Sequence, residues 1–362
     1  MPSPDAIVLP EVNLVEVRLD PVQTMINSMV LLIQSEELSG LNPWIYETAS
    51  ALTPEEWDTH KLVMIGLHYA VTTNRTWKDF PSYVADLEKA DPISLRDQIL
   101  DFYIAYEPCE LEGAVLTGDK DSLLEDEDFF LEYITGKFGT DKIDRELEAR
   151  AFALLKDPPQ MKKQITSHLR HMWEKYYQAE WERVKPMLED SVLAFSGTDF
   201  SGMTRDEIAK YITGRDASPD FWEHVGDRDT LVFVPSAHNG PYVGKFEFKN
   251  TYGVIFGARL PEDTQVHAPD LSRNEITIRL SALADDLRLN ILKVIAEEGE
   301  MRSQEIMDKL DLSQSAASRH LKQLSATGYL TERRCSGAKC YSLNEDRVQD
   351  TLRAVAAFLL CE

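Results

Sequence analysis

The sequence predicts a mainly α-helical protein with two parts: a large helical N-terminal domain that contains a few short strands, and a small C-terminal domain of helices and one β-hairpin. Three observations predict this division. Apolar residues recur every three to four positions along most of the chain, β-branched and aromatic runs are short and few, and every tryptophan lies in the first domain. The tryptophans are Trp44, Trp57, Trp77, Trp173, Trp181 and Trp222. We expect the domains to comprise residues 1–268 and 269–362.

The first domain is expected to begin with a strand and to continue as a series of helices. Val12 to Leu19 alternates between apolar and polar residues, and Pro21 is suited to the first turn of an apolar helix through Ile33. Further helices are predicted at residues 54–68, 81–87, 93–105, 123–138, 142–155 and 162–195. The last one carries an aromatic stripe, which we interpret as core rather than as the lining of a ligand pocket. This stripe consists of Leu169, Trp173, Tyr177, Trp181, Val184 and Leu188.

Short strands are predicted near the end of this domain. They lie at residues 231–235, 242–248 and 252–257, and turn-forming residues separate the first two. A proline-bounded segment at residues 261–269 then predicts the linker to the second domain. At this length the first domain can bury a substantial core, either as one body or as two lobes.

Charge is distributed unevenly between the two domains. Residues 1–270 hold 25 Lys and Arg against 48 Asp and Glu, a net charge of −23, whereas residues 271–362 have a net charge of −1. A surface this acidic excludes a second nucleic-acid site in the first domain, because it repels phosphates. We interpret it as a solvated acidic face, and the alternative is a docking face for a basic partner.

The most informative segment is a helix predicted from Ser313 to Leu324. Ser313 is placed to accept hydrogen bonds from the free N–H groups of the first helical turn. Ala317, Leu321 and Leu324 recur at helical spacing and form one apolar stripe. The other face carries short polar residues followed by cations, which is typical of a helix that enters the major groove of DNA. Those residues are Gln314, Ser315, Ser318, Arg319 and Lys322.

The flanking segments predict a winged helix-turn-helix. Residues 303–310 form a second short helix, and only Asp311 and Leu312 separate it from Ser313. Gly328 is suited to a left-handed helix cap. Residues 329–334 then run extended to a basic tip at 335–339, and residues 339–343 return as the partner strand. A β-hairpin in this position is a wing.

Residues 273–360 resemble the winged helix-turn-helix of the ArsR family of bacterial repressors. The segments that carry the resemblance are LADDLRLNIL at 283–292, SRHLKQL at 318–324, GYL at 328–330 and YSL at 341–343. The family usually has proline where Leu287 stands, and leucine is a good helix former. The first domain loosely resembles the uncharacterised N-terminal domain of some ArsR-type regulators. Its matching pieces are the opening strand and Pro21 helix, residues 168–174 with 180–181 and Pro186, and residues 231–236.

The resemblance implies a homodimer that packs through the helices before and after the winged domain. The sequence supports this independently, because the apolar stripes of those helices exceed what one small core needs. The predicted dimerisation residues are Ile276, Leu280, Leu283, Leu352, Val355, Phe358 and Leu359. The alternative is that these stripes pack against the N-terminal part of the same chain.

Double-stranded DNA with an inverted-repeat operator is the expected partner of such a dimer. The predicted DNA-binding residues are Ser313, Gln314, Ser315, Ala316, Ser318, Arg319, His320, Lys322, Arg333, Arg334 and Lys339. Base edges or the adjoining phosphates are the expected targets of Gln314, Ser315, Ala316, Ser318 and Arg319. Phosphates or the minor groove are the expected targets of Lys322, Arg333, Arg334 and Lys339. His320 abuts the apolar stripe, so packing is its alternative role.

No catalytic residue, metal site or cofactor is predicted. The sequence has no glycine-rich phosphate loop, no nucleophile elbow and no zinc-protease helix. His168, His171 and Glu174 share one helix at a spacing compatible with a metal, but they lie off the apolar stripe and are expected to be exposed.

The four cysteines leave one redox question open. Cys335 and Cys340 face each other if the wing is tight, which allows a thiol or thiophilic-metal role. Metal-responsive members of the family carry cysteines in the first helix of the helix-turn-helix, and residues 303–310 contain none. Cys109 and Cys361 have no neighbours of ligand type. Without a signal peptide or an apolar run of about 18 residues, we expect a cytoplasmic protein with free thiols and no membrane partner.

We therefore expect a sequence-specific transcriptional repressor, controlled by an unidentified small molecule or partner that the N-terminal domain senses. Two alternatives stay open. One is a protein-interaction regulator whose acidic N-terminal domain docks another protein, and the other is a thiol- or metal-responsive repressor that uses the wing cysteines. An enzyme fused to a regulator would require a cluster of buried ionisable groups in an N-terminal cleft.

Overall fold

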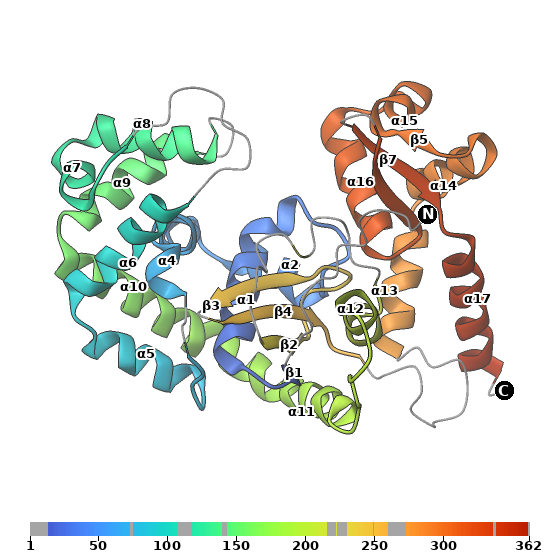
Figure 1. The fold of residues 1–362 in the computed structure, drawn as a ribbon, viewed down its shortest axis with the longest axis horizontal. Helices are drawn as coiled ribbons and strands as arrows, with labels where there is room; N and C mark the ends of the chain where they lie inside the picture. The colour runs from blue at the N-terminus through green and yellow to red at the C-terminus, as the bar shows by residue number, and fades with distance from the viewer. Residues whose placement is uncertain are drawn as a thin grey trace, which may run out of the picture. The chain divides into compact units, whose positions relative to one another are not determined.

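The computed structural model has the predicted class, because it is mainly helical with a few short strands (Figure 1). It describes residues 14–72, 75–106, 117–139, 143–215, 222, 230–248, 250–259, 273–335 and 338–360. The predicted linker at 261–269, Cys109 and Cys361 lie outside these residues. Every described helix is too short or too polar to cross a lipid bilayer.

The chain groups into two compact units, each assembled from separate stretches of sequence. The first unit comprises Met1–Asp20, Gln34–Tyr46 and Arg183–Glu362, and the second comprises Pro21–Ile33 and Glu47–Glu182. The predicted boundary at residue 268 concerns domains that are contiguous in sequence, and it stays a prediction.

The second unit is built from helices. They are α1 (Pro21–Ile33), α3 (Pro54–Lys61), α4 (His68–Val71), α5 (Phe80–Lys89), α6 (Pro92–Ala105), α7 (Lys120–Glu125), α8 (Glu127–Phe138), α9 (Arg145–Leu155) and α10 (Pro158–Met172). Two more helices, α2 (Pro43–Ala51) and α11 (Gln178–Phe195), are divided between the units. The helix predicted from Pro21 to Ile33 is confirmed.

Local chemistry explains where the prediction and the structure differ. The single helix predicted at 123–138 is two helices, because the Asp126 side chain accepts from the Phe129 N–H at 2.9 Å and caps a new start. The helix predicted at 162–195 is divided into α10 and α11 by a π-helical turn at Trp173–Tyr177. The aromatic stripe is core as predicted, since Leu169, Tyr177 and Leu188 are fully buried.

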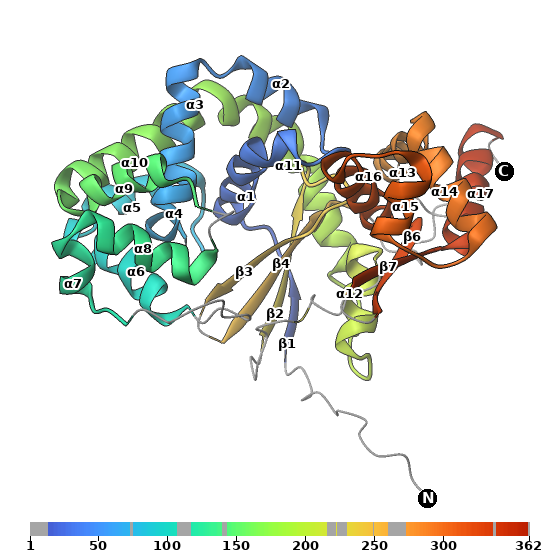
Figure 2. The same cartoon turned by 90° about the horizontal axis from the view of Figure 1, so that it is seen from above.

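A four-stranded sheet forms the centre of the first unit, and Figure 2 shows its strands side by side. The order is β1 (Leu14–Val17), β2 (Thr230–Ser236), β4 (Thr251–Gly257) and β3 (Gly244–Phe248). The first three strands are parallel, and β3 pairs antiparallel with β4. Phe195 of α11 and Ile212 of α12 (Arg205–Thr213) pack on its apolar face with Phe233 and Phe256. Helices α2 and α12 are missing from the sequence-based prediction.

The winged helix-turn-helix is confirmed at the C-terminal end of the first unit. Its elements are α13 (Arg273–Leu283), α14 (Asp286–Glu298), β5 (Met301–Arg302), α15 (Ser303–Leu310), α16 (Gln314–Ala326), β6 (Leu330–Cys335), β7 (Ala338–Leu343) and α17 (Glu345–Leu360). The hairpin β6–β7 is the wing, and β5 adds a short third strand next to β7. Ile291, Ile306, Leu321, Leu324 and Tyr329 lie in its common apolar core.

Candidate nucleic-acid interface

Helix α16 has the cap and the two faces that the sequence predicts for a recognition helix. The Ser313 hydroxyl accepts from the Ala316 N–H at 3.3 Å. Asp311 makes the preceding tight turn in the left-handed conformation, at φ 51°, which aspartate tolerates better than most residues. Ala317, Leu321 and Leu324 are almost completely buried. Their burial turns the opposite side of α16, with its polar residues, toward solvent.

A groove of about 620 Å³ lies between α15, α16 and the wing. Its lining includes the polar or positively charged residues Arg302, Gln304, Gln314, Ser318, Lys322 and Lys339. The structure therefore brings four predicted DNA-binding residues together from two elements. Arg302 and Gln304 were not predicted. The pairing of Arg302 with Cys340 in the small sheet places them there, and that pairing is a tertiary contact that sequence spacing does not reveal.

Acidic neighbours offset part of the positive charge on the wing. The Lys339 ammonium lies 2.6 Å from a carboxylate oxygen of Glu332. Arg333 forms an ion pair with Glu300 and holds the pKa of that carboxyl below its usual value. Both cations are more than half exposed, so solvent and salt weaken these pairs. A DNA phosphate can therefore compete for the same donors.

The remaining predicted DNA-binding residues divide by exposure. Ser315, Arg319 and Arg334 are exposed, and Ala316 is half-buried. His320 is half-buried, with Nδ1 4.0 Å from a carboxylate oxygen of Asp285, and burial lowers its pKa. Asp285 caps α14, so His320 faces that helix and does not line the groove. A contact between His320 and DNA stays a prediction.

The predicted dimerisation residues also differ in exposure. Leu280 on α13 and Leu352, Phe358 and Leu359 on α17 are exposed, at 38%, 58%, 52% and 69% of their surface. Leu283 and Val355 are half-buried, and Ile276 is buried within the chain at 6%. An apolar surface that reaches solvent at four large side chains is suited to an interface.

Gln323 connects the inner side of α16 to other parts of the first unit. Its side chain is buried, and its amide oxygen accepts from Arg288 Nη1 at 2.8 Å and from the Ser39 hydroxyl. Gly40 has no Cβ and therefore leaves room for this side chain, since a Cβ there would lie 2.6 Å from Nε2 of Gln323. Sequence reasoning missed this contact. A polar residue beside the apolar stripe is the only hint that the sequence holds.

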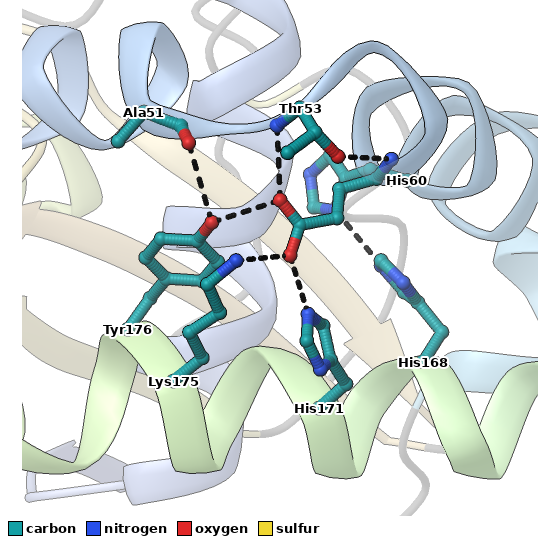
Figure 3. A network of polar contacts seen from close by, with 8 residues as sticks. Ala51, Thr53, His60, His168, His171, Lys175 and Tyr176 are labelled. Atoms are coloured by element: carbon teal, nitrogen blue, oxygen red, sulfur yellow. Dashed lines mark hydrogen bonds and ion pairs between the residues drawn. The ribbon is translucent and has the colours of Figure 1, made fainter.

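A second polar cluster lies in the second unit, where His60 of α3 meets His168 of α10 (Figure 3). His60 Nδ1 lies 2.9 Å from His168 Nε2, and His60 Nε2 lies 2.9 Å from the Met29 carbonyl oxygen. Because a carbonyl only accepts, His60 Nε2 carries a proton, and Nδ1 then accepts from His168. Burial lowers the pKa of His60 to about 4 and that of His168 to about 3.

The predicted exposure of His168 is therefore wrong. His168 is buried at 4%, because α3 covers the side of α10 from which it projects. His171 is exposed and lies 2.6 Å from a carboxylate oxygen of Glu56. Burial disfavours ionisation of Glu56, but hydrogen bonds from Lys175, the Thr53 N–H, His171 and Tyr176 outweigh it and lower its pKa (Figure 3). The two histidines thus have different partners.

The wing cysteines meet across the hairpin. Cys335 and Cys340 form a disulfide, with Cα atoms 6.0 Å apart. The expectation of free thiols does not hold for this pair, because the register of β6 and β7 brings the two side chains together. Glu300 is the third group: its carboxylate lies within 4.8 Å of both sulfurs, so after reduction of the disulfide these three would form the one potential metal-binding cluster among the described residues.

Comparisons with known proteins converge on the winged part of the chain. The sequence profile of the arsR family of bacterial regulatory proteins matches residues 285–332. An arsenic resistance transcriptional regulator from Pseudomonas putida is 46% identical over 57 residues, which are 16% of this chain and 44% of that protein. An uncharacterized HTH-type transcriptional regulator from Methanocaldococcus jannaschii is 35% identical over 74 residues, 20% of this chain and 83% of that protein. The chain thus spans less than half of the first relative and most of the second.

Proposed function

The chain belongs to the ArsR family of bacterial regulatory proteins, and from this premise we propose that it is a dimeric, sequence-specific repressor of transcription. Its partner is double-stranded DNA with an inverted-repeat operator. An effector that the N-terminal region senses, either a small molecule or another protein, controls its affinity for that operator.

One observation carries the proposal: Gln314, Ser318 and Lys322 of α16 line the same groove as Lys339 of the wing. An amide can pair with adenine in the major groove, whereas hydroxyl and ammonium groups hold phosphates. Arg319, on the same helix, supplies the fork of donors that suits guanine. The groove thus combines groups that read bases with groups that position the backbone.

The exposed leucines and phenylalanine of α13 and α17 support a dimer. A two-fold dimer presents two copies of α16 to one face of the duplex. Its half-sites should therefore be about 10–11 base pairs apart, or a multiple of that spacing.

Selection from a randomised duplex pool tests the proposal directly. The intact protein should enrich an inverted repeat, and Lys322→Ala should weaken binding to all sequences and reduce the salt dependence by about one phosphate contact. Lys293→Ala is the matched control, because Lys293 is exposed on α14 and lies outside the groove lining. Failure of the wild-type protein to enrich any sequence would remove the proposal and favour a protein-docking role for the acidic region.

A second candidate function rests on Cys335, Cys340 and Glu300. A regulator that responds to thiol oxidation or to a thiophilic metal would use this cluster to alter the wing. Operator affinity should then differ between oxidised and reduced protein, and the difference should vanish in the Cys335→Ser, Cys340→Ser double variant. Equal affinity in both redox states, with and without zinc, would exclude this candidate.

A further inference from the structure

A cavity of about 50 Å³ lies within the first unit, where the sheet and α12 meet helices α13, α16 and α17. Four arginines line it: Arg215 after α12, Arg259 after β4, Arg279 on α13 and Arg347 on α17. Glu275 is the one carboxylate among the described lining residues. The described lining therefore carries a positive charge of three, in a chain that is otherwise strongly acidic.

Two of the four guanidinium groups donate to backbone carbonyls, and the other two form ion pairs with Glu275. Arg215 Nη1 donates to the Pro241 carbonyl at 2.6 Å, and Arg347 Nη2 donates to the Gly214 carbonyl at 2.7 Å. Arg279 is buried and donates to Glu275 at 3.0 Å. These contacts fix the positions of the guanidinium groups around the cavity.

Two glycines leave room for arginine side chains to lie close to the backbone. A Cβ on Gly214 would lie 1.7 Å from Nη1 of Arg259, and one on Gly328 would lie 2.7 Å from Nε of Arg347. Both glycines also have positive φ values, of 70° and 81°. Side chains at either position would push a guanidinium out of place, so the backbone is shaped around the arginines.

The positive charges of Arg215 and Arg347 disfavour each other. Burial lowers the pKa of Arg215 to about 10, Tyr242 counteracts this shift, and the nearby charge of Arg347 adds to it. A negative group in the cavity would relieve this repulsion. The volume accommodates roughly three to five water-sized spheres, which suits one carboxylate or phosphate group.

We propose that this cavity binds the anionic group, carboxylate or phosphate, of a small-molecule effector. The inference rests on the proposed function for its regulatory consequence, although the binding itself does not. Arg215 and Arg259 come from the sheet region and Arg279 and Arg347 from the winged helices. A bound anion therefore ties the two regions together through bidentate contacts that arginine favours.

Two paths lead from the cavity to the recognition helix. Thr327, in the lining, donates to the Gln323 carbonyl at 2.8 Å at the end of α16. Tyr242, also in the lining, donates to the Ser39 carbonyl at 2.8 Å, and the Ser39 hydroxyl donates to the Gln323 side chain. Occupancy of the cavity thus acts on both the backbone and the side chain of one α16 residue.

Calorimetric titration of the intact protein with sodium phosphate, and separately with sodium acetate, tests the site at ionic strength held constant with chloride. At least one anion should bind saturably, and Arg215→Gln should weaken that binding at least tenfold. Arg145→Gln is the matched control, since Arg145 is exposed at the start of α9. Arg215→Lys, which retains the charge and loses the planar fork, should bind with intermediate affinity and replaces Arg215→Gln if that variant melts early.

The two anions distinguish a phosphate-bearing effector from a carboxylate-bearing one. No saturable binding of either anion up to about 10 mM, the weak end of ligand affinities, would overturn the site. Equal binding by the wild type and Arg215→Gln would do the same.

A second measurement separates this inference from the proposed function. The anion that binds should change the affinity of the wild-type protein for its selected operator severalfold, and should not change that of Arg215→Gln. Operator selection without anion binding contradicts only the site, and anion binding without operator selection contradicts only the proposed function. Anion binding that leaves operator affinity unchanged removes the regulatory role.

Discussion

Arg319 is the residue whose substitution separates base reading from general DNA affinity. If its exposed guanidinium pairs with guanine, Arg319→Ala should cost about 1–3 kcal/mol on the operator and relax the preference at one base pair per half-site. Lys339→Ala, in the wing, should instead weaken all sequences alike. Titration of both variants against a randomised DNA pool measures the difference, and an Arg319→Ala profile identical to wild type contradicts the assignment.

The buried histidine pair predicts how stability depends on pH. Folding lowers the pKa of His60 from 6.5 to about 4 and that of His168 from 6.5 to about 3. Between those values the unfolded chain binds more protons, so stability should fall as pH drops from about 6.5 toward 3. Each pKa unit corresponds to about 1.4 kcal/mol, so the two histidines together allow a loss approaching about 8 kcal/mol near pH 3.

Glu148 acts in the opposite direction, because burial raises its pKa from 4.5 to about 7 and stability is lost as pH rises through that range. A comparison with His168→Gln isolates the histidine contribution, since Glu148 is common to both proteins. The difference in free energy of unfolding between wild type and His168→Gln should change steadily from pH 7 to pH 4 in urea melts. A difference that is constant over this range would contradict the buried pair.

The burial or exposure of a residue was predictable where its position on one helix face determines it. Leu321 and Leu324 had to be buried once the period of α16 was recognised, and Gln314, Ser318 and Lys322 then had to face outward. Gln323 and His168 show the limit. Their environments depend on Ser39 and His60, which are remote in sequence, and periodicity within one helix does not identify such partners.

At the scale of elements, the outer helices of the winged part predict assembly. Phe358 is half exposed on α17, and Val355 lies one turn earlier. Replacing both by Asp should place charges in the proposed interface, give monomers and abolish tight operator binding. Sedimentation at micromolar concentration checks this, and a wild-type protein that is already monomeric would refute the dimer.

Elements were predictable where caps and periodicity agree. Helix α1 follows the predicted bounds, and the strands β2, β3 and β4 lie where β-branched and aromatic runs indicate them. Helix α12 was missed although Thr204 and Glu207 form a capping box, a local cue that is weak in so short a segment. The break at Trp173 was missed because a π-helical turn retains the apolar spacing of the helix around it.

At the scale of the whole molecule, the charge asymmetry predicts an effect on non-specific binding. With a net charge of −23 in residues 1–270, the protein should repel arbitrary DNA at long range. Neutralising three exposed acids by Glu125→Gln, Glu132→Gln and Glu182→Gln should tighten random-DNA binding at low salt. The gain should shrink near 0.15 M salt, where the screening length is about 8 Å. A salt series on both proteins measures it, and equal affinities at low salt would contradict the repulsion.

The arrangement of distant segments within the first unit was outside the reach of sequence reasoning. The predicted strands carried no information on partners, and β1 pairs in parallel with β2 from a distant part of the chain. The cavity with four arginines is a product of the same arrangement, because its lining comes from segments between Thr213 and Arg347 that share no motif.

The pairing of β1 with β2 also orders the events of biosynthesis. Leu14 lies opposite Thr230, so β1 cannot pair with β2 until more than two hundred further residues have been translated. At about 5–20 residues per second this takes roughly ten to forty seconds. The second unit is complete by Glu182 and can fold during that interval, while β1 stays exposed on the nascent chain. The winged helix-turn-helix follows β2 in the chain, so it is translated after both strands of this pair.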